Sequence, residues 1–379
     1  LVFACEFSCA TMAQEQWVGL DVGASSAMVV GASGEIIRNE LGGHSSASVV
    51  AFDGNERYVG EAGVSQLSVN AANAVPVGEL ISLNEALKVH RRFSCDQDSV
   101  TVAYAGQQQR KLQIASVLAA LLRKLGSLAT ARLGTCKFAV AAPPCATPEQ
   151  LQLVRVAAKA ARLVPATEDA SFQTADACLR RVYAWKHGPS IPAGETRVVA
   201  IVDVGRCSAL CTVAEFTTDS VSRVLSTTSS RDDLCGTAAL DAALFDWVLA
   251  HKLEGERSCV RPGTKKGARL LGAVERVRKL LSTMKEAKVT CENLGEDCDV
   301  DISATRDDLR TAAAKVLTHL RSLLETCRCE VDAVEVLGGG GRVALFRDLI
   351  ADVFGVAEDS LGAKLDDASV AHGAACSPP

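Results

Sequence analysis

The sequence is poor in aromatic residues and has no excess of basic charge. Aromatic side chains make up 4% of its 379 residues, and the formal net charge is −5. A protein that binds nucleic acid over a broad surface needs a basic face, whereas the basic clusters here, such as Arg91-Arg92 and Lys265-Lys266, are short. The composition therefore argues against direct nucleic-acid binding, and we interpret these clusters as solvated faces.

Long apolar runs are missing too. No uninterrupted apolar run reaches the length of a membrane span. The first eleven residues are apolar but lack a basic n-region, which argues against a secretory signal peptide. The sequence does not begin with Met, and the stretch that begins at Met12 resembles the N-terminus of a cytosolic protein. We therefore interpret residues 1–15 as leader or fragment sequence. These features predict a cytoplasmic protein without membrane contact.

Cysteine pairs of the metal-binding kind are absent, although the chain has 15 cysteines. No two cysteines are separated by two residues, the spacing of zinc-binding and redox motifs. Several lie inside apolar runs, for example Cys178 and Cys211, as expected of cysteine used as a small buried hydrophobe in a reducing compartment. We therefore assign no metal ligand and expect no disulfide framework.

The chain does have a large apolar fraction in alternating strand and helix patterns. Hydrophobic residues make up 48% of the sequence, enough for a large core and two domains. A long helical pattern covers residues 109–132, interrupted by Gly126, and capping boxes at Thr147 and Thr305 open two more helices. Between such patterns lie short β-rich runs, at 49–52, 137–141 and 333–337. The alternation predicts an α/β protein.

The sequence Asp-Val-Gly-x-x-Ser-Ala occurs twice, at Asp21–Ala27 and at Asp203–Ala209. Each copy has an apolar strand before the glycine turn and another after it, which predicts two β-hairpins. An Asp-x-Gly turn at a strand end lets backbone N–H groups approach a phosphate. We predict two related lobes, residues 16–190 and 191–379, with their boundary at the Pro/Gly-rich segment 186–196.

Two further stretches suit nucleoside recognition. Four glycines, residues 338–341, join a β-rich run to a helical pattern, and glycine lets backbone approach a flat ligand; a tight strand-to-helix connection is the competing interpretation. Four polar residues at i, i+3, i+4 and i+7 share one helical face, namely Glu275, Arg278, Lys279 and Ser282. That face is either solvated or the polar wall of a nucleoside site.

Taken in order, these stretches resemble the nucleotide-binding domain of the heat-shock protein 70 family, over roughly residues 16–376. The resemblance implies the actin-like ATPase (ribonuclease H-like) fold, in which two lobes enclose a nucleotide cleft. It implies ATP or ADP as cofactor, accompanied by Mg²⁺. It rests on five segments: VGLDVGASSAMVV, IIRNELGGHSSASVVAFDGNERYVGEAG, VVAIVDVGRCSAL, LGGGGRVALFRDLI and DDASVAHGAA.

The resemblance also implies the nucleotide contacts. Asp21 and Asp203 would contact metal-bound water or phosphate. The phosphate-binding residues would be Gly23, Ala24, Ser25, Gly205, Arg206, Cys207 and Ser208. The adenosine-binding residues would be Glu275, Arg278, Lys279, Ser282, Gly338, Gly339, Arg342 and Asp367. Arg206 stands where the family has glycine, so it either occupies space that a phosphate would use or supplies positive charge.

Three groups that the family uses for hydrolysis are altered. The phosphate-orienting lysine falls at Glu79, where a carboxylate would repel phosphate. The water-positioning glutamate falls near Ser171, with Glu168 or Asp169 as displaced substitutes. A carboxylate that holds the metal through water falls at Leu210. We therefore predict nucleotide binding with weak or absent hydrolysis.

The resemblance implies a chaperone or co-chaperone that assists protein folding through partner proteins. We expect no counterpart of the family's peptide-binding domain within these residues. The altered loops resemble the Ssz-type branch, which implies a J-domain co-chaperone or another Hsp70-type partner, and the ribosome. Segment 291–303 also fits the heat-shock protein 110 branch. Two alternatives stay open: an active chaperone ATPase or nucleotide-exchange factor, and an interaction pseudo-ATPase that holds no nucleotide.

Overall fold

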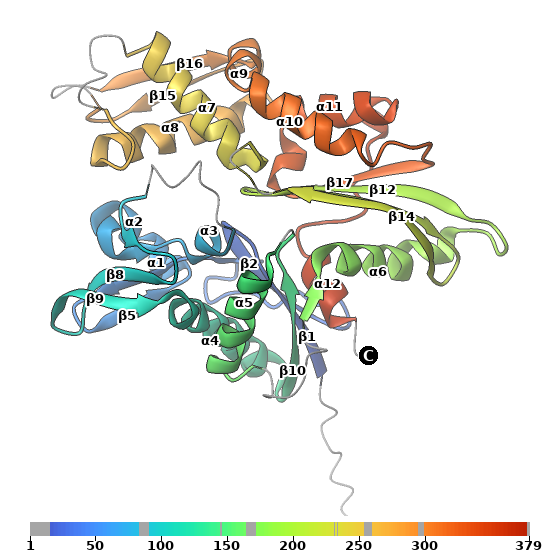
Figure 1. Ribbon diagram of the computed structural model, residues 1–379, viewed down its shortest axis with the longest axis horizontal. Helices are drawn as coiled ribbons and strands as arrows, with labels where there is room; N and C mark the ends of the chain where they lie inside the picture. Colours follow the sequence, from blue (N-terminus) through green and yellow to red (C-terminus); the bar gives the residue numbers. More distant parts are fainter. Residues whose placement is uncertain are drawn as a thin grey trace, which may run out of the picture.

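The computed structural model of the chain describes residues 16–82, 91–144, 146–163, 172–230, 232, 234–253, 260–294 and 299–376. The described chain forms two lobes, each built around its own main β-sheet with helices packed against it (Figure 1). Strands and helices alternate along the chain, and the predicted α/β class is confirmed.

Lobe I carries a five-stranded sheet of order β11-β10-β1-β2-β3 and two three-stranded sheets. In the large sheet, β1 pairs antiparallel with β2 and parallel with β10. The strands are β1 (Gln16–Val22), β2 (Ser26–Gly31), β3 (Ser46–Ala47), β4 (Val50–Asp53), β5 (Glu56–Val59), β6 (Ala74–Val75), β7 (Ser94–Cys95), β8 (Ser99–Tyr104), β9 (Gln107–Gln113), β10 (Cys136–Ala142) and β11 (Phe172–Thr174). The helices are α1 (Glu61–Val64), α2 (Gln66–Val69), α3 (Val77–Ser82), α4 (Ile114–Leu133), α5 (Pro148–Ala160) and α6 (Ala175–His187), with a 3₁₀ turn η1 (Ala71–Asn73).

Lobe II carries a four-stranded sheet of order β14-β13-β12-β17 and a separate hairpin of β15 and β16. The strands are β12 (Arg197–Val204), β13 (Ala209–Phe216), β14 (Val221–Ser230), β15 (Glu286–Cys291), β16 (Val300–Thr305) and β17 (Ala333–Leu337). The helices are α7 (Gly236–His251), α8 (Lys265–Leu281), α9 (Arg306–Ala312), α10 (Ala314–Glu325) and α11 (Ala344–Phe354), with 3₁₀ turns η5 (Gly339–Arg342) and η6 (Glu358–Ser360). Two further elements are the 3₁₀ turn η4 (Gly188–Ser190), which follows α6, and the last helix, α12 (Ser369–Ala375).

The two sheets repeat one arrangement. β1 with β2, and β12 with β13, are antiparallel hairpins, and each first strand has a parallel neighbour on its other side, β10 or β17. Even the turns match, because Gly23 N donates to Ser26 O at 3.0 Å and Gly205 N donates to Ser208 O at 2.9 Å. The two hairpins predicted from the Asp-Val-Gly-x-x-Ser-Ala repeat are confirmed.

The helix expected over residues 109–132 differs from the prediction at its start and at Gly126. Residues 107–113 form β9, which pairs with β8, and the helix α4 begins at Ile114. The Gln, Arg and Lys residues of this strand favour helices in isolation, but pairing with β8 decides their conformation. Gly126 does not break α4; a Cβ there would lie 2.4 Å from Leu163 Cδ2, so glycine permits close packing.

Helix α4 is long and apolar enough to cross a membrane by length and composition alone, although polar residues interrupt its apolar sequence. In the structure, 56% of the most apolar 18-residue stretch of this helix is buried inside the protein. Its buried side chains, among them Leu121, Leu122 and Leu125, belong to the apolar core of lobe I. Burial of this kind is expected of a core helix.

The predicted capping boxes are present. Thr147 and Gln150 cap α5, with Pro148 at the first helical position, and Thr305 and Asp308 cap α9. In both, the side chain of the third helical residue returns to the N-cap backbone N–H, which satisfies two otherwise unpaired donors.

The last helix departs from the predicted division into residues 16–190 and 191–379. α12 packs against β1, β2, β10 and α6, all in lobe I (Figure 1). The approach to β1 is so close that a Cβ on Gly19 would lie 1.7 Å from Ala371 O, so only glycine fits there. Lobe I is therefore built from both ends of the described chain.

Candidate functional site

Carboxylates from both lobes meet where the two hairpins face each other. Asp21 is at the end of β1, Asp203 is at the end of β12, and Asp367 precedes α12. Burial, then repulsion from Asp203 and Asp367, raises the pKa of Asp21 to about 7. Burial, then Asp367, raises the pKa of Asp203 to about 6. Oxygen donors whose charges repel one another in this way fit a hard divalent cation such as Mg²⁺.

These shifts predict a pH dependence of stability. Because Asp21 titrates near 7 when folded and near 3.8 when unfolded, the folded chain holds more protons between these values. The free energy of unfolding should therefore fall as pH rises from about 4 to about 7 and should level off above. Thermal unfolding should show a lower Tm at pH 8 than at pH 5, and Asp21→Asn should shrink that difference. The exposed Asp53→Asn control should keep it; an equal difference in both variants would contradict the assignment.

The backbone of the glycine run after β17 packs closely against one of these carboxylates, Asp203. Gly338 has φ +80°, and a Cβ there would lie 2.3 Å from Asp203 Oδ1 and 2.5 Å from Val204 O. Gly339, by contrast, has no atom within 4 Å of its Cβ position, so its surroundings are open. The run therefore combines close backbone packing at Gly338 with free space beside Gly339.

Replacing Gly338 by alanine should be far more disruptive than replacing Gly339. The left-handed backbone and the clash with Asp203 should together lower the free energy of unfolding by about 2 kcal/mol or more. Urea unfolding of Gly338→Ala and Gly339→Ala measures the difference directly. Equal free energies of unfolding of the two variants would show that the backbone at Gly338 can move away from Asp203 without loss of stability.

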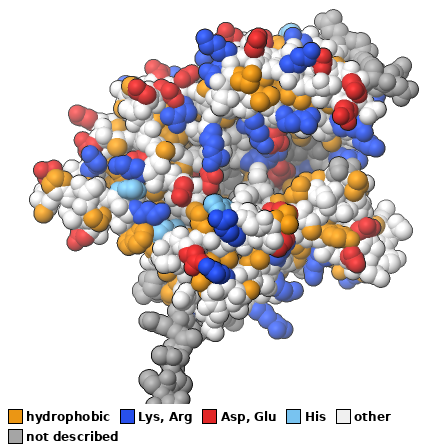
Figure 2. Space-filling view, turned by 180° about the vertical axis from the view of Figure 1, so that it is seen from behind, with side chains coloured by type: hydrophobic (Ala, Val, Ile, Leu, Met, Phe, Trp, Pro, Cys, Tyr) orange, Lys and Arg blue, Asp and Glu red, His pale blue; other side chains and the backbone are white. Residues whose placement is uncertain are grey.

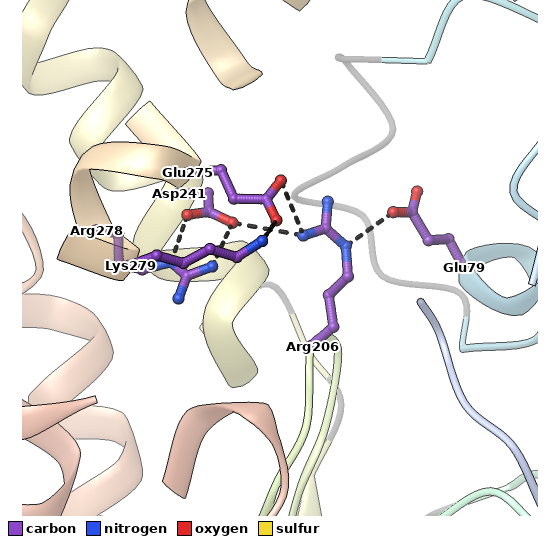
Figure 3. A network of polar contacts seen from close by, with 6 residues as sticks. All are labelled: Glu79, Arg206, Asp241, Glu275, Arg278 and Lys279. Atoms are coloured by element: carbon purple, nitrogen blue, oxygen red, sulfur yellow. Dashed lines mark hydrogen bonds and ion pairs between the residues drawn. The ribbon is translucent and has the colours of Figure 1, made fainter. Parts of the chain in front are cut away.

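The second hairpin turn carries a cation that joins the two lobes (Figure 3). Arg206 Nε donates to Glu79 Oε1 at 2.9 Å, and its Nη1 lies 3.4 Å from Asp241 Oδ2 and 3.9 Å from Glu275 Oε2. Glu79 is on α3 of lobe I, whereas Asp241 and Glu275 are on α7 and α8 of lobe II. We call this ion pair between Arg206 and Glu79 the interlobe bridge.

Close packing holds both ends of the interlobe bridge in place. A Cβ on Gly78 would lie 2.2 Å from Gly23 O, so the start of α3 packs directly on the first hairpin turn and presents Glu79 there. On the other side, Thr237 N donates to Gly205 O at 3.0 Å and Ala238 N donates to Arg206 O at 2.8 Å. The first turn of α7 thereby fixes the second hairpin turn.

Behind Arg206 lies a buried ion pair. Arg278 Nε donates to Asp241 Oδ1 at 2.6 Å, and the two side chains are only 5% and 1% exposed. Burial raises the pKa of Asp241, while Arg278 and Arg206 oppose that rise. Asp241 therefore contacts two arginines at once, and Glu79 balances the charge of Arg206 from the other side.

The predicted polar face of α8 is divided between different environments. Arg278 points inward to Asp241, and Lys279 pairs with Glu275 at 2.8 Å on the exposed side (Figure 3). Although desolvation raises the pKa of Glu275, the cations Arg206 and Lys279 hold it below its usual value. Ser282 Oγ donates to Arg278 O at 3.3 Å, at the end of the helix.

The two hairpin turns touch through small apolar side chains. Cys207 and Ala238 are buried together, with Ala24 of the first turn packed against them. Burial raises the pKa of the Cys207 thiol to about 12, so the thiol stays neutral. Leu210, where the resemblance predicts the loss of a carboxylate, is also buried and belongs to the apolar cluster that includes Leu337 and Val370. The turns therefore offer less polarity than two phosphate-binding loops normally would.

Three of the predicted adenosine contacts lie around a cavity. It measures about 430 Å³ and is lined by Gly338, Arg342 and Asp367 of lobe II and by Met28 and Ile36 of lobe I. Arg342 Nη2 donates to Asp367 Oδ2 at 2.5 Å, which joins two predicted adenosine contacts. A cavity of this size accommodates a small organic ligand.

Two residues of this region carry no functional signal in the sequence. Asp241, the carboxylate shared by Arg206 and Arg278, follows a run of small residues that gives no signal of its own. Arg91, interpreted as a solvated residue, lines a cavity next to Arg206 and Glu79. The position predicted for a water-positioning glutamate, near Ser171, and its predicted substitutes, Glu168 and Asp169, lie outside the described residues.

One group of mixed metal-ligand types occurs in the part of the chain that the structure describes. Donor atoms of Asp232, Cys235 and His319 lie within 4.8 Å of one another, between the start of α7 and α10. His319 Nε2 is 2.9 Å from Asp232 Oδ2, the distance of an ordinary ion pair. None of the three is a predicted nucleotide contact. All ten described cysteines are free thiols.

Comparison with known proteins places these features in a family. The profile of the Hsp70 protein family matches residues 17–378. The chain is 28% identical over 384 residues to a heat shock protein homolog of Lachancea kluyveri, covering 94% of this chain and 54% of that protein. It is 27% identical over 364 residues to heat shock protein hsp88 of Neurospora crassa, covering 89% and 50%.

A third relative, heat shock protein 110 of Caenorhabditis elegans, is 25% identical over 366 residues, covering 90% of this chain and 46% of that protein. The chain thus spans about half the length of the curated relatives it matches.

Proposed function

The chain belongs to the Hsp70 protein family, whose profile matches nearly all of it, and on that premise we propose that it binds ATP and ADP and hydrolyses ATP weakly or not at all. The observation that carries this proposal is the interlobe bridge. At the position of the phosphate-orienting lysine stands Glu79, and its charge is engaged by Arg206 at 2.9 Å. Arg206 in turn forms ion pairs with Glu79 and Asp241, so its charge is not free to take over the role of the phosphate-orienting lysine.

The residues that would hold a nucleotide and its cation fit those ligands. Asp21, Asp203 and Asp367 would bind Mg²⁺, directly or through water, and the cation would relieve their mutual repulsion. The open backbone at Gly339 and the nearby Arg342 would contact the adenosine. Bound Mg²⁺ would supply charge neutralisation for the phosphates. The buried Leu210 adds no carboxylate to that set.

The wider role that we propose is that of a cytoplasmic chaperone or co-chaperone domain that acts through an Hsp70-type partner. The names of the relatives support the heat-shock protein 110 alternative more than the Ssz-type branch, because one relative is itself named heat shock protein 110. A J-domain partner and the ribosome belong to the Ssz-type interpretation and have less support. Since the relatives extend well beyond this chain, its folding clients and partners remain proposals.

Two measurements on one preparation test the function. Calorimetric titration with ATP and with ADP, in the presence of Mg²⁺, should give binding heat for both. Single-turnover hydrolysis of labelled ATP should be slow or undetectable. Absence of heat and of any thermal shift would instead favour an interaction protein that holds no nucleotide. Hydrolysis at the rate of an active family member would overturn the proposal.

A further inference from the structure

We propose that the cavity between lobe I and helix α8 binds a small phosphoanion, with Arg91 as its anchoring cation. The cavity measures about 690 Å³, within the size range of small-molecule sites. It opens beside the interlobe bridge, with Glu79 and Arg206 among its lining residues. Of the predicted nucleotide contacts, this cavity includes Arg206 and Glu275, whereas Gly338, Arg342 and Asp367 line a different one. Anion binding there does not require a nucleoside.

The lining of this cavity is strongly positive. Six cationic side chains face it against three carboxylates, and two of these carboxylates, Glu79 and Glu275, already pair with Arg206 and Lys279. The six cations are Arg91, Arg92, Arg206, Lys265, Arg269 and Arg276. Figure 2 shows Lys and Arg side chains gathered on the lobe II side of the hollow between the lobes. A surplus of cations in a concave site attracts anions.

Arg91 supplies the observation that points to a ligand. Its Nη1 makes one long contact, 3.8 Å, to Cys95 Sγ. Its Nε and Nη2 are buried and have no hydrogen-bond partner. Buried guanidinium donors without an acceptor cost free energy, and a phosphate would supply acceptor oxygens in the geometry of the guanidinium fork.

Further cations of the lining are available to contact the same anion. Among the residues that the structure describes, no ion pair engages Arg92, Lys265 or Arg276. Arg92 belongs to lobe I, like Arg91, whereas Lys265 and Arg276 are on α8 of lobe II. An anion in this cavity would therefore be held from both lobes. Several converging cations favour a multiply charged ligand, so we expect a chain of linked phosphates and not a single carboxylate.

Such a phosphate chain could come from two sources, a free oligophosphate or the tail of a nucleotide. Sodium tripolyphosphate, without nucleotide or added metal, is the first probe, and ATP is the second. Calorimetry should detect tripolyphosphate binding to the unmodified chain, weakening as salt concentration rises. Arg91→Gln should weaken it roughly 10-fold or more, because a charged hydrogen-bonding anchor is lost.

Control variants separate a lost anchor from a lost fold. Arg276→Gln, an exposed position in the same cavity, should weaken tripolyphosphate binding several-fold without unfolding the chain. Arg132→Gln, which removes an exposed ion pair with Glu35 elsewhere, should leave it unchanged. Arg342→Gln should weaken ATP and spare tripolyphosphate if the anion is free. If the nucleotide tail occupies the cavity, Arg91→Gln should weaken ATP and tripolyphosphate alike.

The proposal fails if the unmodified chain does not bind tripolyphosphate at millimolar concentration. It also fails if both Arg91→Gln and Arg276→Gln, folded by circular dichroism, bind it as the unmodified chain does. Neither failure bears on ATP binding at the adenosine contacts, which Arg342→Gln reports separately. Conversely, tripolyphosphate binding by a chain that ignores ATP would sustain the anion site and reject the proposed function.

Discussion

Replacing Arg278 by methionine should lower the free energy of unfolding by about 3 kcal/mol. The substitution keeps the apolar stem and removes the cation that Asp241 contacts at 2.6 Å in a buried setting. Asp241 would then keep only Arg206, 3.4 Å away, to balance a charge that burial already destabilises. Because that second partner remains, we place the cost at the low end of what removal of one member of a buried pair produces.

Urea unfolding followed by circular dichroism measures this cost. Arg321→Met, which breaks an exposed ion pair with Asp352, is the matched control and should change stability by less than about 1 kcal/mol. The double variant Arg278→Met with Asp241→Leu should recover part of the loss, since no unpaired charge then stays buried. A cost for Arg278→Met as small as that of the control would show that water reaches Asp241.

Single-turnover ATP hydrolysis should be at least about 100-fold slower than that of an active member of the family. Loss of one preorganised charge at a reacting centre typically costs about 10²–10³ in rate. Here Glu79 replaces that charge with its opposite, and Leu210 removes a carboxylate. Quench-flow with labelled ATP, at protein concentrations above the measured Kd, gives the rate without any contribution from product release.

Variants can distinguish a charge defect from a general loss of the site. Glu79→Lys alone should not speed hydrolysis, because the new lysine would repel Arg206 across the interlobe bridge. Glu79→Lys combined with Arg206→Gly should be faster than either single variant, since it restores a free cation and clears the second turn. If the unmodified chain already hydrolyses ATP as fast as an active member, the interlobe bridge does not inhibit the chemistry.

Much of the fold could be predicted because its signals are local. The repeated Asp-Val-Gly-x-x-Ser-Ala sequences formed two hairpins with the same turn hydrogen bond, and the capping residues Thr147 and Thr305 began helices. In each case the decisive contacts lie within a few residues along the chain. Strand β9 has a sequence typical of a helix, but pairing with its partner, β8, decides its conformation.

The electrostatics of the site could be predicted only in part. Two interpretations of Arg206 were open, and neither included a partner 127 residues away on α3. Likewise, helical spacing predicts Arg278 as one of four residues on a polar face, but packing turns it inward to Asp241 on another helix. Side chains that meet across lobes are brought together by the tertiary fold, and helical spacing carries no information about them.

The return of α12 to lobe I has a consequence for how the protein is made. The ribosome releases β1 long before α12, yet the close approach at Gly19 brings these two elements into direct contact. Lobe II, which is encoded between them without interruption, can fold as soon as it emerges. Lobe I must keep a groove of its sheet open until α12 has emerged, so the apolar surface around β1 stays uncovered on the nascent chain for longer than the core of lobe II.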